Sequence, residues 1–181
     1  SGICSSFDEV QVTLKTVPDV AASSATICSG ASTSISITNP NGVAGTTFTW
    51  TILTSTNVTG ASAGTGNSIS QVLSVSDGVT QGSVTYRIIP SANGCSGAFV
   101  DATVTVNPTP TITTPASSLV ETICSDTQLN FTPTSNVAGT NYSWTATFTG
   151  TLAGVNASGT GAVNDRPVNT GNTSGTITYV I

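Results

Sequence analysis

The sequence lacks histidine and methionine entirely, and only 6% of its 181 residues are charged. Without histidine, no side chain has a usual pKa near neutrality, so general acid–base catalysis would have to rest on carboxylates. The few acids are scattered or recur with the repeat described below, as Glu9 and Asp101 do. We therefore expect no enzymatic activity, no catalytic residue and no cofactor.

Positive charge is also scarce. Three basic residues stand against eight acidic ones, which gives a net charge of -5. A protein that binds nucleic acid or an anionic membrane surface needs a basic patch, and three cations cannot build one. No apolar run approaches the roughly 20 residues that a membrane-spanning helix requires. The sequence thus predicts neither nucleic-acid binding nor membrane insertion.

The chain has four cysteines but no CxxC pair, and no histidine could complete a mixed zinc site. We therefore expect no such metal site. Cysteines in a chain with very few lysines favour an oxidising, extracellular setting in which they form disulfides. A calcium ion held between modules is a weaker alternative, with Asp101 and Glu121 as its ligands.

An internal repeat dominates what is present. The stretch TICSGASTSISITNPNGVAGTTFTW begins at Thr26, and TICSDTQLNFTPTSNVAGTNYSW begins at Thr122. Equivalent residues are 93 to 96 positions apart, from the first Cys of each copy to the later Trp and Tyr. A third, partial copy opens the chain, where CSSFDEVQVTL echoes CSGAFVDATVTV at an offset of about 92. Such a period indicates tandem modules.

The repeat sets the expected boundaries. Residues 1–16 correspond to the last strand of a preceding module, residues 17–107 to a complete module, and residues 108–181 to a module truncated before its final strand. The stretch NPTPTITTP, from Asn107 to Pro115, carries three prolines and reads as a short stiff linker.

The pattern within each module predicts strands. β-branched residues dominate, turn residues recur at short intervals, and apolar positions alternate with threonine and serine. In residues 46–53 this alternation places Phe48, Trp50 and Ile52 on one face. The sequence predicts an all-β fold of tandem antiparallel immunoglobulin-like or PKD-like β-sandwich modules, with a core that contains Trp50, Trp144, Tyr86 and Tyr179.

The pairing of the cysteines has two solutions. If each module closes on itself, Cys28 pairs with Cys95, and the partners of Cys4 and Cys124 lie outside residues 1–181. Such a bridge would stabilise the module by about 4 kcal/mol. However, an immunoglobulin-type strand order puts the two positions at opposite ends of the sandwich, beyond the reach of a disulfide. The alternative is a bridge between neighbouring modules.

Several stretches resemble a known family. TICSG before a strand, FTW in the next, GSVTYRIIPSANGCSG and then VTVNPTP are similar to the PKD-like, immunoglobulin-like repeats of giant Bacteroidetes surface adhesins, including type IX secreted gliding-motility adhesins. The resemblance implies a stalk or filament shaft, located outside the cell at its surface. Neighbouring repeats, surface glycans or other adhesin chains are the implied partners. The alternatives are a glycan-binding or surface-binding module and an accessory domain of a secreted hydrolase.

Overall fold

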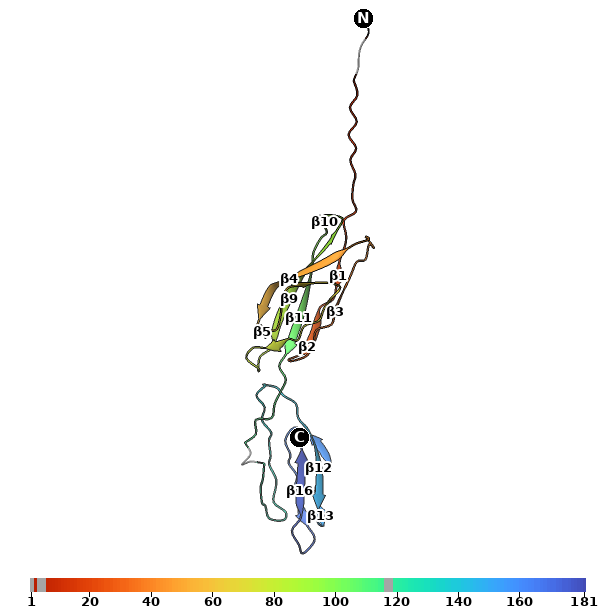
Figure 1. Cartoon of the computed structure of the whole chain (residues 1–181). Coiled ribbons are helices and arrows are strands. Elements are labelled where there is room, and N and C mark those ends of the chain that lie inside the picture. Colours follow the sequence, from red (N-terminus) through yellow and green to blue (C-terminus); the bar gives the residue numbers. More distant parts are fainter. Residues whose placement is uncertain (1, 3–5, 116–118) are drawn as a thin grey trace. The chain divides into compact units, whose positions relative to one another are not determined.

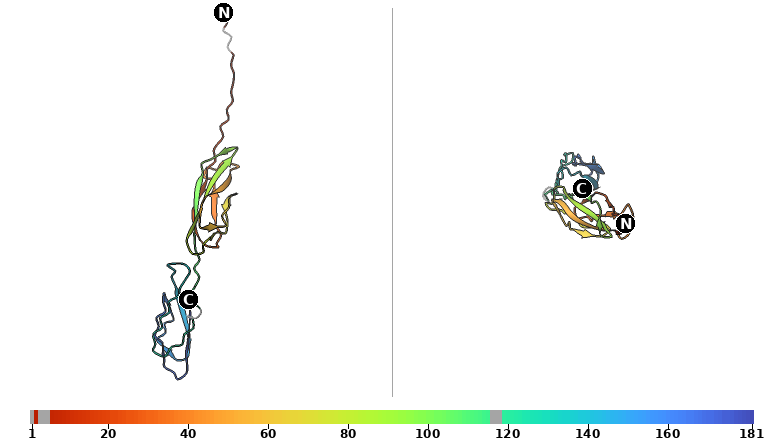
Figure 2. Two further views of the ribbon diagram at one scale, coloured as in Figure 1. Left: turned by 90° about the vertical axis from the view of Figure 1, so that its left-hand side faces the viewer. Right: turned by 90° about the horizontal axis from the view of Figure 1, so that it is seen from above.

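The computed structural model describes residues 2, 6–115 and 119–181, so Cys4 lies outside the described residues. The chain divides into two compact units, Ser1–Asn107 (unit 1) and Pro108–Ile181 (unit 2). No helix occurs in the described part of the chain, and both units are built from strands (Figures 1 and 2). The predicted all-β fold is therefore confirmed.

Unit 1 is a β-sandwich. Its strands are β1 (Ala21–Ala22), β2 (Ala25–Cys28), β3 (Ile35–Thr38), β4 (Thr47–Thr56), β5 (Val58–Thr59), β6 (Gly64–Thr65), β7 (Ser68–Ile69), β8 (Ser74–Val75), β9 (Gly82–Ala92), β10 (Cys95–Ser96) and β11 (Val100–Asn107). The larger sheet has the order β2-β11-β9-β4-β6, with β10 paired to β9. A second sheet has the order β1-β3-β7, and β5 pairs with β8.

The core of unit 1 follows from strict alternation along its longest strands. Every second residue of β9 is buried from Gly82 to Ala92, because successive side chains of a strand point to opposite faces. The neighbouring β11 buries Ala102, Val104 and Val106 completely. From the second sheet, isoleucines of β3 and β7 complete one apolar cluster between the two layers.

The first and last strands of the larger sheet along the chain, β2 and β11, pair with each other. β11 runs antiparallel to β9 but parallel to β2, with Val104 opposite Ala25 and Asn107 opposite Cys28. The chain enters unit 1 at the other end, where Lys15 Nζ donates to the Asn93 carbonyl at 2.7 Å. The chain therefore enters and leaves unit 1 at opposite ends of the sandwich.

The predicted inward face of residues 46–53 is only partly correct. Phe48 and Trp50 are 4% and 6% exposed, but Ile52 is 37% exposed. The pairing of β4 with β9 shifts register between Ile52 and Thr54, which marks a bulge. Ile52 is the last residue before this bulge, and from Thr51 onward every residue of β4 is exposed.

Residues 6–16 belong to no strand of the described chain. Their apolar side chains lie in solvent, as the exposed fractions of Phe7 (92%), Val10 (83%), Val12 (74%) and Leu14 (92%) show. Figure 1 shows residues 6–16 as an extended stretch that precedes the strands of unit 1.

Unit 2 repeats the central part of unit 1. Its strands are β12 (Ser143–Thr149), β13 (Leu152–Ala153), β14 (Ser158–Thr160), β15 (Val168–Asn169) and β16 (Thr176–Val180). The order β14-β12-β16 matches β6-β4-β9 of unit 1, and the pair β13-β15 matches β5-β8. In the matching registers, Ala146 lies opposite Tyr179 as Ile52 lies opposite Tyr86.

Unit 2 has no counterpart of β11 among residues 119–181, and its core is correspondingly open. Trp144 and Val163 are buried, but Tyr179 is only half-buried whereas Tyr86 is completely buried. Residues 121–124, the counterpart of β2, form no strand. Because β2 pairs only with β11, its counterpart has no strand to pair with.

Candidate functional site

Both tryptophans are buried core residues, each packed against a glycine of the neighbouring strand. Trp50 and Trp144 are each 6% exposed. A Cβ added to Gly64 would lie 2.5 Å from Cζ2 of Trp50, and one added to Gly159 would lie 2.4 Å from Cζ2 of Trp144. With their faces covered, these indoles cannot stack on a ligand.

A tyrosine hydroxyl in each unit holds a loop to the central sheet. In unit 1, Tyr86 donates from its hydroxyl to Oε1 of Gln71 at 2.8 Å. The Gln71 side chain also bonds the backbone of Ser62, accepting from N at 3.0 Å and donating to O at 2.8 Å. Burial raises the pKa of Tyr86. We call this arrangement the tyrosine latch.

The tyrosine latch recurs in unit 2 with a carboxylate at its centre. Tyr179 donates to Oδ2 of Asp165 at 2.7 Å, and the backbone N–H of Asn156 donates to the same atom at 3.1 Å. The Asn156 side-chain amide donates to Asp165 Oδ1. Burial, together with the Asp165 carboxylate, raises the pKa of Tyr179 well above its usual range.

Asp165 is only 2% exposed, which would be typical of a functional carboxylate. Its position argues for a structural role instead. The offset of 94 residues places it at the position of Gln71, and Asn156 at the position of Ser62. Since the same contacts recur with a neutral amide in unit 1, their shared role is to fix a loop.

Two ion pairs tie neighbouring segments within the units. Arg87 binds Asp101 through two hydrogen bonds of 2.9 and 2.8 Å, and its Cζ lies 3.7 Å from the centre of the Phe99 ring. These bonds lower the pKa of Asp101 and raise that of Arg87. In unit 2, Arg166 pairs with Asp126 at 3.0 Å in an exposed position.

The carboxylate of Asp77 accepts hydrogen bonds from its own loop. Its Oδ1 accepts from the backbone N–H groups of Thr80 and Val79, each at 2.9 Å, and from the Asn57 amide at 3.1 Å. The backbone N–H groups of Thr80 and Val79 hold the pKa of Asp77 well below its usual range. The carboxylate thus stabilises the turn between β8 and β9.

The described residues contain no group of three or more His, Cys, Asp or Glu side chains placed to hold a metal ion. The two acids considered for calcium lie in different units, Asp101 in unit 1 and Glu121 in unit 2. Asp101 is already bound by Arg87. Glu121 lines an open hollow of unit 2 together with Phe131 and Asn130.

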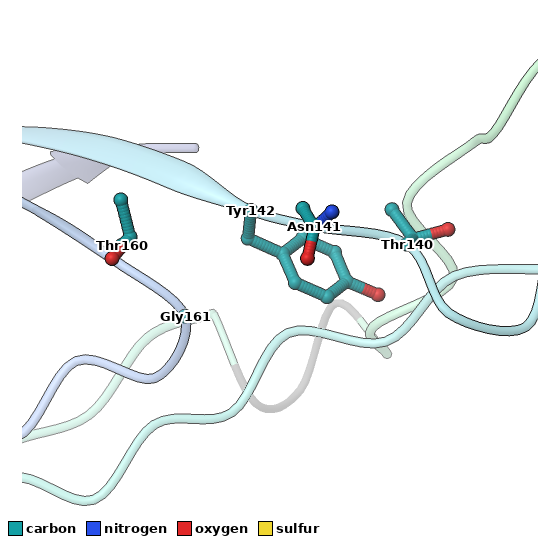
Figure 3. A pocket seen from close by; sticks show the side chains of 5 residues that line it. All are labelled: Thr140, Asn141, Tyr142, Thr160 and Gly161. Carbon is teal, nitrogen blue, oxygen red and sulfur yellow. The ribbon is translucent and has the colours of Figure 1, made fainter.

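A second hollow of unit 2 surrounds Tyr142 (Figure 3). It is lined by Thr140, Asn141, Tyr142, Thr160 and Gly161. In unit 1, the equivalent Phe48 lies opposite Pro90 of β9 and is buried. The pairing of β12 with β16 stops at Thr145 and Val180, so no residue of β16 lies opposite Tyr142. The hollow therefore lies at the position where Pro90 faces Phe48 in unit 1.

Of the two alternatives for the cysteines, the pairing of Cys28 with Cys95 within one module does not fit the fold, because the two cysteines lie at opposite ends of the larger sheet. Cys28 lies opposite Asn107, beside the Gly82 end of β9, whereas Cys95 lies opposite Ala92 at the other end. At about 3.3 Å per residue, the length of β9 separates them by roughly 30 Å, far beyond disulfide reach.

Cys28, Cys95 and Cys124 are free thiols in the structure. Cys28 and Cys124 are exposed. Cys124 lies within the part of unit 2 that corresponds to β2, at the equivalent of Cys28. Cys28 and Cys124 therefore lie at the surface of their units, and Cys95 is partly exposed.

The tyrosine latch was not predicted from the sequence. Gln71, Ser62 and Asp165 are polar residues of short loops, where nothing local marks a partner far along the chain. The repeat contained the signal: Tyr86 and Tyr179 are equivalent at an offset of 93, and Gln71 and Asp165 are equivalent polar positions at an offset of 94. A comparison of polar loop positions between the copies could have found it.

Comparison with known proteins gives one family. The model of the PKD-like domain matches residues 25–110 and 121–181. Among solved structures, a three-domain immunoglobulin structure of titin domains I67–I69, in a Glu-to-Ala variant, aligns at 14% identity and a TM-score of 0.40. The alignment covers 91% of this chain and 65% of that one. No curated protein matches the chain significantly.

The described residues contain no helix long and apolar enough to cross a membrane. The family match covers most of the chain and falls on both units, whose equivalent strands, tryptophans and latches were described above. The chain therefore belongs to the PKD-like domain family.

Proposed function

We propose that the chain is a structural repeat segment of a large secreted cell-surface adhesin. In this function the modules form part of a stalk or filament shaft that serves attachment or gliding motility. The resemblance to type IX secreted adhesins supports an extracellular location, and neighbouring repeats of the same chain would be the main partners. The role is mechanical.

The pairing of β2 with β11 carries this proposal. These are the first and last strands of the larger sheet of unit 1 along the chain, and they run parallel. A force applied at the two ends of the unit pulls β2 and β11 in opposite directions along their length. Hydrogen bonds that lie across the force are then loaded together, so the pair resists shear as a clamp.

The contacts of the aromatic, buried polar and charged side chains support the same mechanical role. Trp50 and Trp144 are covered by glycines, the buried polar side chains form latches that recur in both units, and Arg87 is bound to Asp101. These groups are engaged in holding strands and loops together. They leave no catalytic constellation among the described residues.

Force spectroscopy on the 181-residue chain, held at both ends, tests the clamp. The Ser29 N–H donates to the Asn107 carbonyl at 2.7 Å. In a parallel ladder alternate N–H groups face the same neighbour, so the N–H of Ala25 faces β11 and that of Thr26 faces away. Ala25→Pro should lower the unfolding force of unit 1, because proline removes the bonding N–H.

Thr26→Pro is the matched control and should leave the unfolding force nearly unchanged. Equal unfolding forces for Ala25→Pro and the unchanged chain would contradict the clamp.

A glycan array tests the rival function, a glycan-binding module. Saturable binding to one sugar that is lost in Tyr142→Ala would favour that function. A catalytic domain in the full reading frame would favour an accessory domain of a secreted hydrolase.

A further inference from the structure

The sequence contains five Asn-x-Ser/Thr motifs, the acceptor pattern for N-linked sugars when x is not proline. Their asparagines are Asn57, Asn130, Asn141, Asn156 and Asn172. A transferase has to reach both the asparagine amide and the hydroxyl two residues on. A motif whose backbone is paired with a neighbouring segment can enter such an enzyme only after that pairing opens. The pairing of each motif therefore decides whether the folded chain can be modified there.

Four of the five motifs are held by main-chain pairing. In each of them one residue of the motif pairs with another segment of its unit: Thr59 with Ser74, Phe131 with Val163, Ser143 with Thr160 and Ser158 with Thr145. Three of these pairings place the hydroxyl residue of the motif in a strand. These motifs are therefore fixed to the surface of their units.

Two of the four are also blocked at the amide nitrogen itself. Asn57 Nδ2 donates to Asp77 Oδ1 at 3.1 Å and to the Thr80 carbonyl at 2.7 Å. Asn156 Nδ2 donates to the Asp165 carboxylate of the tyrosine latch. A sugar on either nitrogen would replace a hydrogen bond that holds a loop.

The motif of Asn172 differs from the other four. It lies in the loop between β15 and β16, and none of its residues Asn172, Thr173 and Ser174 belongs to a strand or a β-bridge. All three residues are exposed. Within the described part of the chain, neither the Asn172 amide nor the Ser174 hydroxyl has a hydrogen-bond partner. Both groups that a transferase needs are thus accessible together.

The loop is held by other side chains. The Thr170 N–H donates to the Thr151 carbonyl at 2.9 Å. The Asn169 side chain accepts from the Gly171 N–H at 2.9 Å and donates to the Thr173 carbonyl at 2.8 Å. None of these bonds uses the side chain of Asn172. A group attached to its nitrogen would therefore cost the fold no contact.

We propose that Asn172 is the acceptor for an N-linked sugar in the folded chain and that the fold protects the other four motifs. The donor is a nucleoside diphosphate hexose. The amide nitrogen bonds to the anomeric carbon, and the bond from that carbon to the diphosphate oxygen breaks. The nucleoside diphosphate leaves with the electron pair, and the amide proton passes to a base of the transferase. The site belongs to one loop of unit 2 and does not depend on the mechanical function.

Modification of the folded 181-residue chain tests the proposal. We would incubate it with UDP-glucose and a soluble glucosyltransferase specific for Asn-x-Ser/Thr, count hexoses by intact mass and locate them by fragmentation. We expect one hexose, on Asn172. Asn172→Gln and Ser174→Ala should each abolish this modification. The matched control Thr173→Ala changes only the middle position of the motif and should retain it.

Synthetic peptides that each contain one of the five motifs separate the effect of the fold from the preference of the enzyme. For Asn172, the rates in the peptide and in the folded chain should agree within about twofold. For the other four asparagines, the folded chain should react at least about tenfold more slowly than the peptide, because the paired backbone must open first.

Three results would overturn the proposal. The first is a hexose that appears on another asparagine of the folded chain before Asn172. The second is an Asn172 that the fold slows as much as it slows the other four. The third is a urea midpoint of unit 2 that drops clearly once Asn172 carries the hexose, because the side chain would then contribute to the fold.

Discussion

Trp50 lies directly against the backbone of Gly64 on the neighbouring strand, with Gly64 opposite it in the register of β4 and β6. A methyl group at Gly64 would come within 2.5 Å of the indole Cζ2, and within 2.9 Å of Cε2. Because the ring is buried, it has little room to move. Gly64 is therefore required by the tryptophan and not by a turn.

Gly64→Ala should destabilise unit 1 by about 1–3 kcal/mol, because the added methyl overpacks a filled core. Urea unfolding, followed by tryptophan fluorescence, measures the loss. Thr65→Ala, on the exposed side of the same strand, should change the free energy of unfolding by less than about 0.5 kcal/mol.

A double-mutant cycle isolates the contact. In a Trp50→Phe background the smaller ring leaves room for the methyl, so Gly64→Ala should cost clearly less than in the presence of the indole. An equal cost in both backgrounds would show that the alanine acts through the backbone and not through the ring.

Asp165→Asn should destabilise unit 2 by about 1–3 kcal/mol. The groups around this carboxylate, from Tyr179 and Asn156, all donate hydrogen bonds, so an amide NH₂ would face donors. Gln71 tolerates its amide because Ser62 offers a carbonyl to accept from it. Urea unfolding with Trp144 as the reporter would measure the change.

The reverse substitution at the equivalent position of unit 1, Gln71→Glu, provides the control for Asp165→Asn. Gln71→Glu would bring a carboxylate against the Ser62 carbonyl and should destabilise unit 1. If both exchanges were neutral, the tyrosine latch would contribute nothing to either unit.

The stability of unit 2 should fall as the pH rises above about 10. The pKa of Tyr179 is raised above the value of 10.0 for a free tyrosine. Folding then favours the protonated hydroxyl: the stabilisation is complete below pH 10 and is lost as the pH rises toward the folded pKa, because the unfolded state ionises first.

Tyr179→Phe should remove this pH dependence from unit 2 while leaving that of unit 1, where the pKa of Tyr86 is also raised. Urea midpoints measured between pH 8 and 11, with each tryptophan removed in turn, separate the two units. If the stability of unit 2 still falls above about pH 10 to the same extent in Tyr179→Phe, other groups cause the pH dependence.

The three described cysteines should react with a thiol reagent in the native chain, since they are free and two of them are exposed. Cys28→Ser and Cys95→Ser should each change the unfolding free energy by less than about 0.5 kcal/mol. A bridge between them would instead contribute about 4 kcal/mol. Unfolding with and without reductant decides between these values, and a large effect of reductant would contradict the separation of the two residues.

The sequence was sufficient to predict the all-β fold, because apolar alternation and the repeat report directly on buried strand faces. It failed at Ile52, since the place where β4 leaves the buried face, next to the register shift with β9, is not marked in the alternation of residues 46–53. It could not choose a partner for Cys28, because equal spacing in each copy fits bridges within and between modules. The latch partners Gln71 and Asp165 were likewise missed, since polar loop residues meet only after folding.

The scarcity of basic residues also determines where the folded chain can be cut. A protease that cleaves after lysine or arginine has three sites. Arg87 lies within β9 in the middle of a sheet, and Arg166 precedes Pro167, a bond that such enzymes cleave poorly. Lys15 is exposed at the end of the N-terminal segment, where cleavage is easy. Trypsin would therefore remove residues 1–15 and leave the strands of both units uncut.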